Sequence, residues 1–594
     1  MRRSSRPEKG RARPRDAAPV GVTILLVGIL YTVLLATRVG PLDGVWSIDQ
    51  GVRIEQIQSL LATRFRSLAS VYPGDAVDPK HGFTPLLGQY FYRDGRSYSM
   101  FSAAWAVLNS LPYRFLSYTG LHVVPLVSTL GLLLVAARLT RGLIGTGWRL
   151  VLILVLGLAT PLFFYSFVFW EHSLVSMLAL LALYLAIREG DGPLKGRLTW
   201  SGALLGLAVW FRPEMVIAVP ALAGALLLTD RPPRWRPILR LAAGAAAALA
   251  SLFLFNQLAY GNFLGPHVLV AGHVIYGGQS LATLQRRRAD WAAFLIAPPW
   301  PVVLTAIGAL LFLRFLYPRL SRTRGRHQLL TLSAAGLAFI GVALLVQTGQ
   351  GLETSLLVTA PLGLLWLLPW PGQTSVQAGG KRIAGKAPEE EARLNASSAR
   401  TGRRLGLFAV LYVSLAFLGV LPDGGNQWGP RMLLPAVAPL VVAGFLRLAE
   451  WTRRPLPAAA GAGLVLAFLA LASAGLFSEL RGLRAIRTAN QDARRFSDAV
   501  AATGERVVVC SDTIVPKLLA PIFYDGYLVF RAETAARFER LAQRLVNHSL
   551  RRLVLIDRPE GPVLPLPPGS VSVVADGPPI PLPKGYRLTV LRLP

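Results

Sequence analysis

The sequence predicts a mainly α-helical, polytopic membrane protein, in which a bundle of about 13 spans precedes a small external α/β domain. Hydrophobic residues make up 53% of the 594 residues and charged residues only 16%, whereas soluble proteins have about 25% charged residues. The apolar residues are gathered in runs of roughly 16–22 residues, which are long enough to cross a hydrocarbon core. This composition excludes an ordinary soluble protein and a disordered one.

The charges lie in short clusters between the apolar runs. The formal net charge is +31, but no single basic domain carries it, so the sequence does not indicate nucleic-acid binding. Basic clusters between spans are typical of cytoplasmic loops under the positive-inside rule. Cys510 is the only cysteine, which excludes an intrachain disulfide and any Cys-based zinc motif.

The chain begins with a basic segment, residues 1–17, which we interpret as a cytoplasmic tail. The apolar run 18–38 follows directly; it is too long for a signal-peptide core and no small-residue cleavage site follows it, so it is predicted to be a retained first span. The further predicted spans are 119–137, 150–167, 172–187, 198–212, 213–229, 239–259, 298–317, 328–347, 355–370, 404–421, 432–450 and 457–477.

The distribution of basic residues predicts the orientation. With the N-terminus inside, the cytoplasmic segments hold about 32 Lys and Arg, against about 12 in the external loops before residue 478, as the positive-inside rule requires. An odd number of spans then places residues 478–594 outside. The sequence therefore predicts a multi-pass plasma (inner) membrane protein with a cytoplasmic N-terminus and an extracytoplasmic C-terminal domain.

Three further segments interrupt or follow the bundle, which we place at 18–477. The first external loop, 39–101, is the longest within the bundle, and residues 371–404 read as a flexible cytoplasmic linker. Residues 478–594 are predicted to form the external α/β domain. Strand-like runs at 507–509 and 553–556 flank a helix-like pattern at 532–547.

Ionisable residues at span ends gather on the predicted external side. They are Asp49, Glu55, Glu171, His172, Arg212, Glu214, His267 and Arg431. Charged residues near a membrane are costly and mark functional sites. Residues 51–63 are predicted to form a short amphipathic helix lying along the interface. Asp49 just precedes this helix, so it is a candidate N-cap as well as a candidate catalytic group.

Several short motifs occur in a fixed order around these residues. They are DQG and QIQSL within 49–60, YPG, DP and F within 72–83, WEHSL at 170–174, WFRPE at 210–214 and WGPRMLLP at 428–435. Over roughly residues 20–450 the set resembles a bacterial subgroup of the GT-C superfamily, which are integral-membrane glycosyltransferases that use polyprenyl-phosphate sugars. In that superfamily the first external loop carries an essential aspartate, and Asp49 matches it. A second acidic pair, Asp-Glu in many relatives, is Glu171-His172 here and departs from the pattern.

The resemblance implies transfer of a hexose or pentose from a polyprenyl-phosphate donor to a hydroxyl of an envelope glycan, lipid or protein acceptor, with inversion. We assign Asp49 as the general base, with Glu171 and His172 as further catalytic candidates. Arg431 and Arg212 are assigned to the donor phosphate because a guanidinium binds phosphate in a fork. The other candidate substrate-binding residues are Glu55, Glu214 and His267, with Glu214 also read as the structural partner of Arg212.

Other interpretations remain open from the sequence. A lipid-linked glycan ligase or polymerase would share the donor. A transporter or flippase would instead carry its ionisable residues near mid-span. A scaffolding protein would need no convergent acid and base set.

Arg286, Arg287 and Arg288 form an external basic run that fits either anionic headgroups or a solvated loop. No metal site is predicted, since His267 and His273 lack a carboxylate at ligand spacing; some relatives use a divalent cation, which leaves one between Asp49 and Glu171 open.

Overall fold

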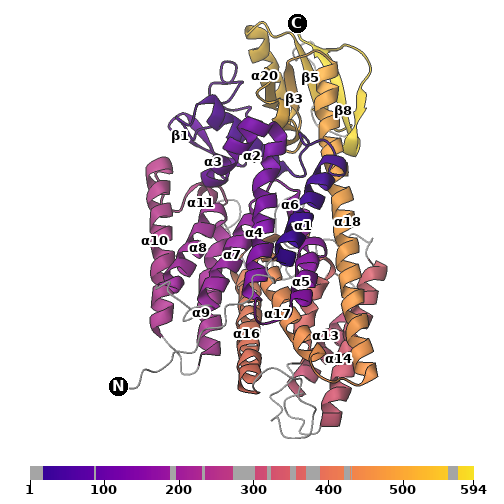
Figure 1. Cartoon of the computed structure of the whole chain (residues 1–594). Helices are drawn as coiled ribbons and strands as arrows, with labels where there is room; N and C mark the ends of the chain where they lie inside the picture. The colour runs from indigo at the N-terminus through magenta and orange to yellow at the C-terminus, as the bar shows by residue number, and fades with distance from the viewer. Residues whose placement is uncertain are drawn as a thin grey trace.

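A computed structural model describes residues 18–85, 88–187, 196–230, 235–271, 301–316, 323–347, 356–369, 388–420, 428–429, 431–559 and 573–594. Figure 1 shows a bundle of roughly parallel helices with a sheet-containing domain at one end. The predicted tail 1–17, the linker residues 371–387, the basic run at 286–288 and His273 lie outside the described residues.

The bundle is built from helices of very different lengths. They are α1 (Ala18–Thr37), α3 (Ala103–Leu116), α4 (Val123–Leu139), α5 (Thr146–Leu158), α6 (Pro161–Ser166), α7 (His172–Ile187), α8 (Arg197–Phe211), α9 (Ala218–Thr229), α10 (Trp235–Tyr260), α11 (Pro266–Ala271), α13 (Pro301–Leu316), α14 (Thr323–Gln347), α15 (Leu356–Thr359), α16 (Pro388–Gly419), α17 (Leu434–Thr452) and α18 (Ala458–Ala502). Short 3₁₀ turns join some of them at η2 (Ser117–His122), η3 (Pro213–Ile217), η6 (Pro361–Leu367) and η7 (Arg431–Leu433).

Within the described residues, seven helical segments are long and apolar enough to cross a membrane. They are Ala18–Thr37, Ala103–Leu139, Trp235–Tyr260, Gly325–Leu344, Asn395–Gly419, Arg431–Thr452 and Ala458–Ala502. Shorter apolar helices, such as His172–Ile187, lie among them. The chain is therefore a membrane protein with a mainly helical fold, as predicted, although the count of 13 spans is not confirmed.

Close helix packing depends on small residues where two backbones meet. A Cβ atom at Gly202 of α8 would lie 1.9 Å from the carbonyl oxygen of Leu241 in α10. The same is true of Gly244 of α10 against the carbonyl oxygen of Thr199. Small residues let helices approach in this way within membranes. A larger residue at either glycine would therefore separate α8 from α10.

The first external loop contains helix α2 (Ile48–Ala62) and the hairpin β1 (Tyr90–Arg93) and β2 (Arg96–Ser99). The predicted helix is present, but it begins three residues earlier and does not lie on the surface. Nearly every residue of its first three turns is buried, because α3 packs on one side and the C-terminal helices α19 (Val515–Leu518) and η8 (Ala520–Ile522) pack on another.

The start of α2 corrects the proposed capping role of Asp49. Ser47 occupies the N-cap position with an extended backbone, and the side chain of Gln50 accepts hydrogen bonds from the backbone N–H groups of Trp46 (2.6 Å) and Ser47 (3.3 Å). This is the reciprocal half of a capping box. Asp49 lies inside the first turn, so its carboxylate is not needed to begin the helix.

The C-terminal domain contains a six-stranded mixed sheet, which confirms the predicted strands and helix. Its strands are β3 (Val507–Cys510), β4 (Leu528–Arg531), β5 (Arg552–Asp557), β6 (Val574–Ala575), β7 (Ile580–Leu582) and β8 (Tyr586–Arg592), and its long helix is α20 (Ala535–Asn547). Along the sheet the order is β4-β3-β5-β8-β6, with β7 also paired to β8. The strand β3 runs parallel to β4 and β5, whereas β8 is antiparallel to β5.

Successive side chains of β3 pack into two different hydrophobic clusters, one on each face of the sheet. Val507 and Val509 of β3 belong to the cluster that contains Phe538 of α20. Val508 and Cys510, which point to the opposite face, belong to the large cluster that continues into the helical bundle. The sheet therefore has α20 on one face and is joined to the bundle through the other.

The first external loop is also fastened to the C-terminal domain. The buried carboxylate of Asp78 accepts a hydrogen bond from Arg544 (2.8 Å) and one from the backbone N–H of Phe83 (2.6 Å). The ring of Phe83 packs into the core of the domain, and its carbonyl oxygen accepts from the N–H of Arg531 (2.9 Å). The loop, the domain and α2 thus form one packed unit above the bundle (Figure 1).

Two predicted boundaries differ from the structure. The second part of the segment predicted as a flexible linker, from Pro388 on, is the beginning of α16, where Glu, Ala, Arg and Leu favour a helix. The helix α18 continues from the bundle across residue 478 to Ala502, so the C-terminal domain is attached by a continuous helix rather than by a loop.

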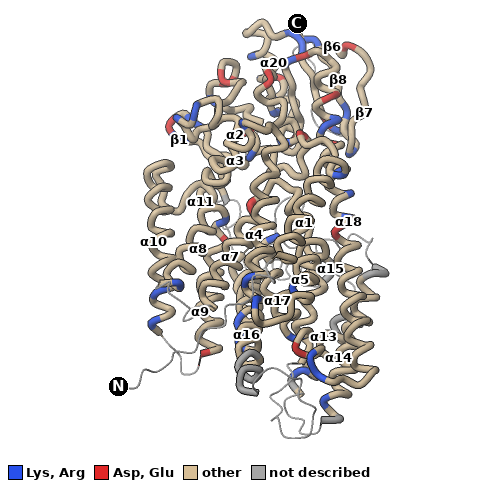
Figure 2. The backbone as a smooth tube through the Cα atoms, in the orientation of Figure 1, with Lys and Arg blue, Asp and Glu red and all other residues tan. Residues whose placement is uncertain are grey.

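The charged residues of the described chain gather at its two ends. Figure 2 shows Lys and Arg at the end of the bundle opposite to the sheet and again on the C-terminal domain, whereas most of the middle is uncharged. Few charges at membrane depth are expected. The orientation relative to the cell stays a prediction.

We expect residue 397 to face the cytoplasm and residue 584 to lie outside. Both side chains, Ser397 and Lys584, are exposed, and the native Cys510 is buried. In intact cells a membrane-impermeant maleimide should label the Lys584→Cys variant, and it should label Ser397→Cys only after permeabilisation. The reverse pattern would invert the topology.

Candidate functional site

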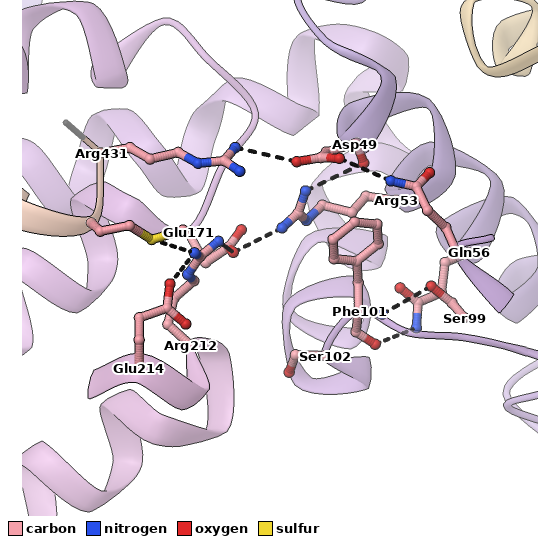
Figure 3. Close-up of polar contacts among 12 residues, drawn as sticks. Asp49, Arg53, Gln56, Ser99, Phe101, Ser102, Glu171, Arg212, Glu214 and Arg431 are labelled. Carbon is pink, nitrogen blue, oxygen red and sulfur yellow. Dashed lines mark hydrogen bonds and ion pairs between the residues drawn. The ribbon is translucent and has the colours of Figure 1, made fainter. Parts of the chain in front are cut away.

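Asp49 lies in a buried group of charged side chains on the bundle side of α2. Its Oδ2 atom accepts a hydrogen bond from Nη1 of Arg431 (3.2 Å), and its Oδ1 atom accepts one from Nε2 of Gln89 (2.9 Å). Asp49 and Arg431 are 382 positions apart in the chain. The structure therefore brings together the predicted base and one predicted phosphate-binding arginine (Figure 3).

Arg53, one helical turn after Asp49, connects this aspartate to the rest of the group. Its Nη1 atom donates to the carbonyl oxygen of Asp49 (3.3 Å) and its Nη2 atom to Oε1 of Glu171 (2.8 Å). The guanidinium lies over the ring of Phe101, 4.0 Å from its centroid. Such a position supports a buried cation by a cation–π interaction.

Glu171 and Arg212 form the other half of the group. Nη1 of Arg212 donates to the same Oε1 atom of Glu171 (2.8 Å), and Nη2 contacts Glu214 and the sulfur of Met432 (3.0 Å). The Oε2 atom of Glu171 is buried and has no hydrogen-bond partner among the described residues. Glu214 is thus the structural partner of Arg212, and Glu171 keeps one carboxylate oxygen for another hydroxyl or N–H donor.

Arg431 reaches the group from η7, directly after the bundle segment that contains Trp428 and Gly429. Its guanidinium lies 4.6 Å from the ring centroid of Trp170. Trp428 stacks on Phe164, with centroids 5.5 Å apart. Arg431 is buried where its guanidinium packs on Trp170 in the segment before α7.

The charge balance of the group determines the state of Asp49. Burial by itself raises the pKa of Asp49, but Arg431, Arg53 and Arg212 together outweigh burial and hold the pKa below its usual value. Asp49 is therefore a carboxylate at neutral pH. In this state it can accept a proton, although the surrounding cations weaken it as a base.

The two histidines lie at the margin of the group. His172, the first residue of α7, packs edge-on against Tyr165 and Trp170, with centroid separations of 5.2 and 5.4 Å. His267 is half-buried in α11 and makes no hydrogen bond to another described residue. Neither imidazole is bonded to Asp49 in the described chain, so an assisting role for either stays a prediction.

Glu55 belongs to a different group, apart from the arginine cluster. Its carboxylate accepts from Ser59 (3.0 Å), Ser70 (3.3 Å), Tyr524 (2.7 Å) and Tyr90. These partners come from α2, the first loop, the C-terminal domain and the hairpin. The structure therefore places Glu55 at the junction of loop and domain, where it joins them, and its role in substrate binding stays a prediction.

This junction predicts a pH dependence of stability. Burial raises the pKa of Glu55 to about 7, and the hydrogen bonds from Tyr524, Ser59 and Ser70 only partly offset it. Because the folded protein holds this proton more tightly than the unfolded chain, stability falls as pH rises from about 4.5 to 7, by roughly 3 kcal/mol. Glu55→Gln should reduce the difference between the melting temperatures at pH 5.5 and pH 8.5. Glu539→Gln, on α20, should leave that difference as it is in the wild type; an unchanged difference in Glu55→Gln would contradict the prediction.

The two carboxylates considered for a divalent cation both accept hydrogen bonds from arginine side chains. Arg53 donates to the backbone carbonyl oxygen of Asp49 and to Oε1 of Glu171, whereas the carboxylate of Asp49 accepts from Arg431 and Gln89. Among the described residues there is no group of three or more His, Cys, Asp or Glu side chains that could hold a metal ion.

Sequence reasoning missed Arg53 and Gln89. Arg53 lies on the predicted helix 51–63, four residues after Asp49. Residues at this spacing share a helix face, so a helix that began three residues earlier would have indicated Arg53. Gln89 carries no such signal because it reaches Asp49 from the other end of the loop.

Comparison with known proteins gives matches among solved structures alone. No family model matches the sequence, and no curated protein matches it. The chain is similar to the oligosaccharyltransferase of Archaeoglobus fulgidus in the apo form, with 13% identity and a TM-score of 0.45 over 90% of this chain and 69% of that chain. It is also similar to ArnT from Cupriavidus metallidurans bound to undecaprenyl phosphate, with 12% identity and a TM-score of 0.45 over 98% of both chains.

A third match is the same archaeal oligosaccharyltransferase, AglB, in complex with an inhibitory peptide and a dolichol-phosphate, with 14% identity and a TM-score of 0.45 over 91% of this chain and 70% of that chain. At these identities and TM-scores, neither the role of a residue nor a substrate is carried over from those proteins to this chain. The functional assignment therefore rests on the side chains of this chain.

Proposed function

We propose that this protein is an integral-membrane glycosyltransferase that moves a sugar from a polyprenyl-phosphate donor to a hydroxyl acceptor on the extracytoplasmic face. The observation that carries the proposal is the ion pair between Asp49 and Arg431 within a buried group that also contains Arg53, Arg212 and Glu171. A proton acceptor and several phosphate-binding cations are the two requirements of this reaction, and here they are in contact.

Arginine suits the donor phosphate. A guanidinium presents several N–H donors in one plane and binds phosphate oxygens in a bidentate manner. The Nε atom of Arg431 is buried and has no hydrogen-bond partner among the described residues, so this side chain has a donor left for a ligand. Cations already in place for the charge that develops on a leaving phosphate stabilise the transition state without reorganisation.

The reaction follows from these positions. The acceptor hydroxyl oxygen attacks the anomeric carbon of the sugar, and Asp49 takes its proton. The bond between the anomeric carbon and the phosphate oxygen breaks, and the electron pair stays on the polyprenyl phosphate, which Arg431 holds. A single displacement of this kind inverts the anomeric carbon. Glu171, with its Oε2 atom unpaired, orients the acceptor.

Donor binding also adjusts the strength of the base. Without the donor, three guanidinium groups lower the pKa of Asp49. A bound phosphate neutralises part of this positive charge, so the pKa of Asp49 rises towards the range in which a carboxylate is an effective base. Asp49 is thereby a stronger base when the donor is present than when it is absent.

The proposal is tested with the purified protein in liposomes that contain a panel of labelled polyprenyl-phosphate sugars. Release of polyprenyl phosphate together with glycosylation of a hydroxyl acceptor supports it, and the panel identifies the sugar. Movement of the intact lipid between leaflets without cleavage would instead show a flippase. Acceptance of lipid-linked oligosaccharides in place of single sugars would indicate a ligase.

A further inference from the structure

The C-terminal domain brings a buried lysine close to the site. Lys517 belongs to α19, which packs directly on α2. A Cβ atom at Gly51, two residues after Asp49, would lie 1.9 Å from the carbonyl oxygen of Lys517. Only a glycine permits this approach of the two backbones. The domain is thus seated on α2 within one helical turn of Asp49.

The side chain of Lys517 has no partner that explains its burial. The residue is 4% exposed, and it makes no hydrogen bond or ion pair with any other residue that the structure describes. A lysine packed inside a protein without a partner for its charge is unfavourable. Among the charged groups, Asp49 has the largest effect on the pKa of Lys517, ahead of Arg531 and Asp512.

The neighbours within the domain do not compete with Asp49 for this ammonium group. Arg531 is paired with Glu533 (2.7 Å). Asp512 is partly exposed and accepts from the backbone N–H groups of Ile514 (2.9 Å) and Val515 (3.0 Å). Burial lowers the pKa of Lys517 to about 8, against the opposing effect of Asp49, so the ammonium group remains mostly protonated at neutral pH.

We propose that Lys517 is a fourth cation of the active site and binds the phosphate of the lipid donor. This inference rests on the proposed function. It makes the C-terminal domain a part of the active site, because α19 supplies a group that no helix of the bundle supplies.

Charge balance gives the reason for a fourth cation. The carboxylates of Asp49, Glu171 and Glu214 match the guanidinium groups of Arg53, Arg212 and Arg431, so Lys517 leaves one positive charge in excess. A sugar phosphodiester carries one negative charge and makes the buried site neutral. After transfer, Asp49 holds a proton and the released phosphate monoester carries a charge of about −2, so the site is neutral again.

The test measures binding of two lipids to the full-length protein in nanodiscs at pH 7.5: polyprenyl phosphate and its methyl phosphodiester. Lys517→Met removes the charge and keeps the aliphatic chain, and Lys584→Met, on the exposed surface of the same domain, is the matched control. We expect Lys517→Met to weaken binding of polyprenyl phosphate by about 10- to 100-fold and binding of the diester less. Lys517→Arg should restore most of the affinity, and Lys584→Met should bind as the wild type does.

Each outcome decides the inference. Unchanged affinity of Lys517→Met for both lipids would overturn it. An equal loss for both lipids together with a lower melting temperature would also overturn it, since that pattern indicates a structural role. If the wild-type protein binds neither lipid, the proposed function itself fails, and that result is distinct from a failure of Lys517 alone.

Discussion

Replacing Asp49 with asparagine is expected to slow sugar transfer by about 10²- to 10⁴-fold, the usual cost of losing a general base. The substitution preserves the size of the side chain and its hydrogen bond to Gln89, but it removes the proton acceptor. Because Ser47 and Gln50 begin the helix, α2 does not depend on Asp49 for its N-cap. Loss of transfer would therefore report on chemistry and not on unfolding of the loop.

Donor binding provides the decisive control for Asp49→Asn. The variant removes one negative charge from the site, so the cations that remain should hold polyprenyl phosphate at least as tightly as in the wild type. The melting temperature is measured in parallel, because Arg431 loses its ion pair. Asp94→Asn, at an exposed position in the same loop, is the matched control and should transfer normally. Transfer by Asp49→Asn at the wild-type rate would show that the proposed mechanism has the wrong base.

Arg431→Lys is expected to lower kcat/KM by about 10- to 100-fold, equivalent to one or two charge-assisted hydrogen bonds. A lysine keeps the charge, but its single ammonium group replaces a fork that contacts Asp49 (3.2 Å) and leaves another N–H for the donor. The stacking of a planar guanidinium over Trp170 is also lost. Steady-state rates over a range of donor concentrations measure the effect.

The control for this substitution is Arg96→Lys, an exposed arginine on β2 of the first external loop. It should have wild-type kinetics, which would show that arginine-to-lysine changes in the loop do not by themselves reduce activity. A melting temperature of Arg431→Lys close to that of the wild type would confirm that the variant is folded. Near-normal kcat/KM in Arg431→Lys would remove Arg431 from the phosphate site.

The sequence by itself determined the class of the protein and most of its elements. Long apolar runs have no stable position except in a bilayer or a buried core, so they indicate the membrane bundle. Short continuous apolar runs with β-branched residues located β3 and β5, because such runs are typical of strands that are buried on both faces. The external charged residues were also visible, since an ionisable residue beside a membrane-spanning run stands out from its surroundings. Asp49, Glu171, Arg212 and Arg431 are among them, and the structure brings these four together.

Tertiary structure alone decided which of these residues share a site. Asp49 and Glu55 lie on the same short helix, yet one faces the arginines and the other joins the loop to the C-terminal domain. Their neighbours come from segments hundreds of residues away, and a local pattern contains no information about such contacts. Lys517 shows this most clearly. It becomes a candidate ligand for phosphate only because α19 packs against Gly51, a contact set by the shape of two surfaces and not by any sequence motif.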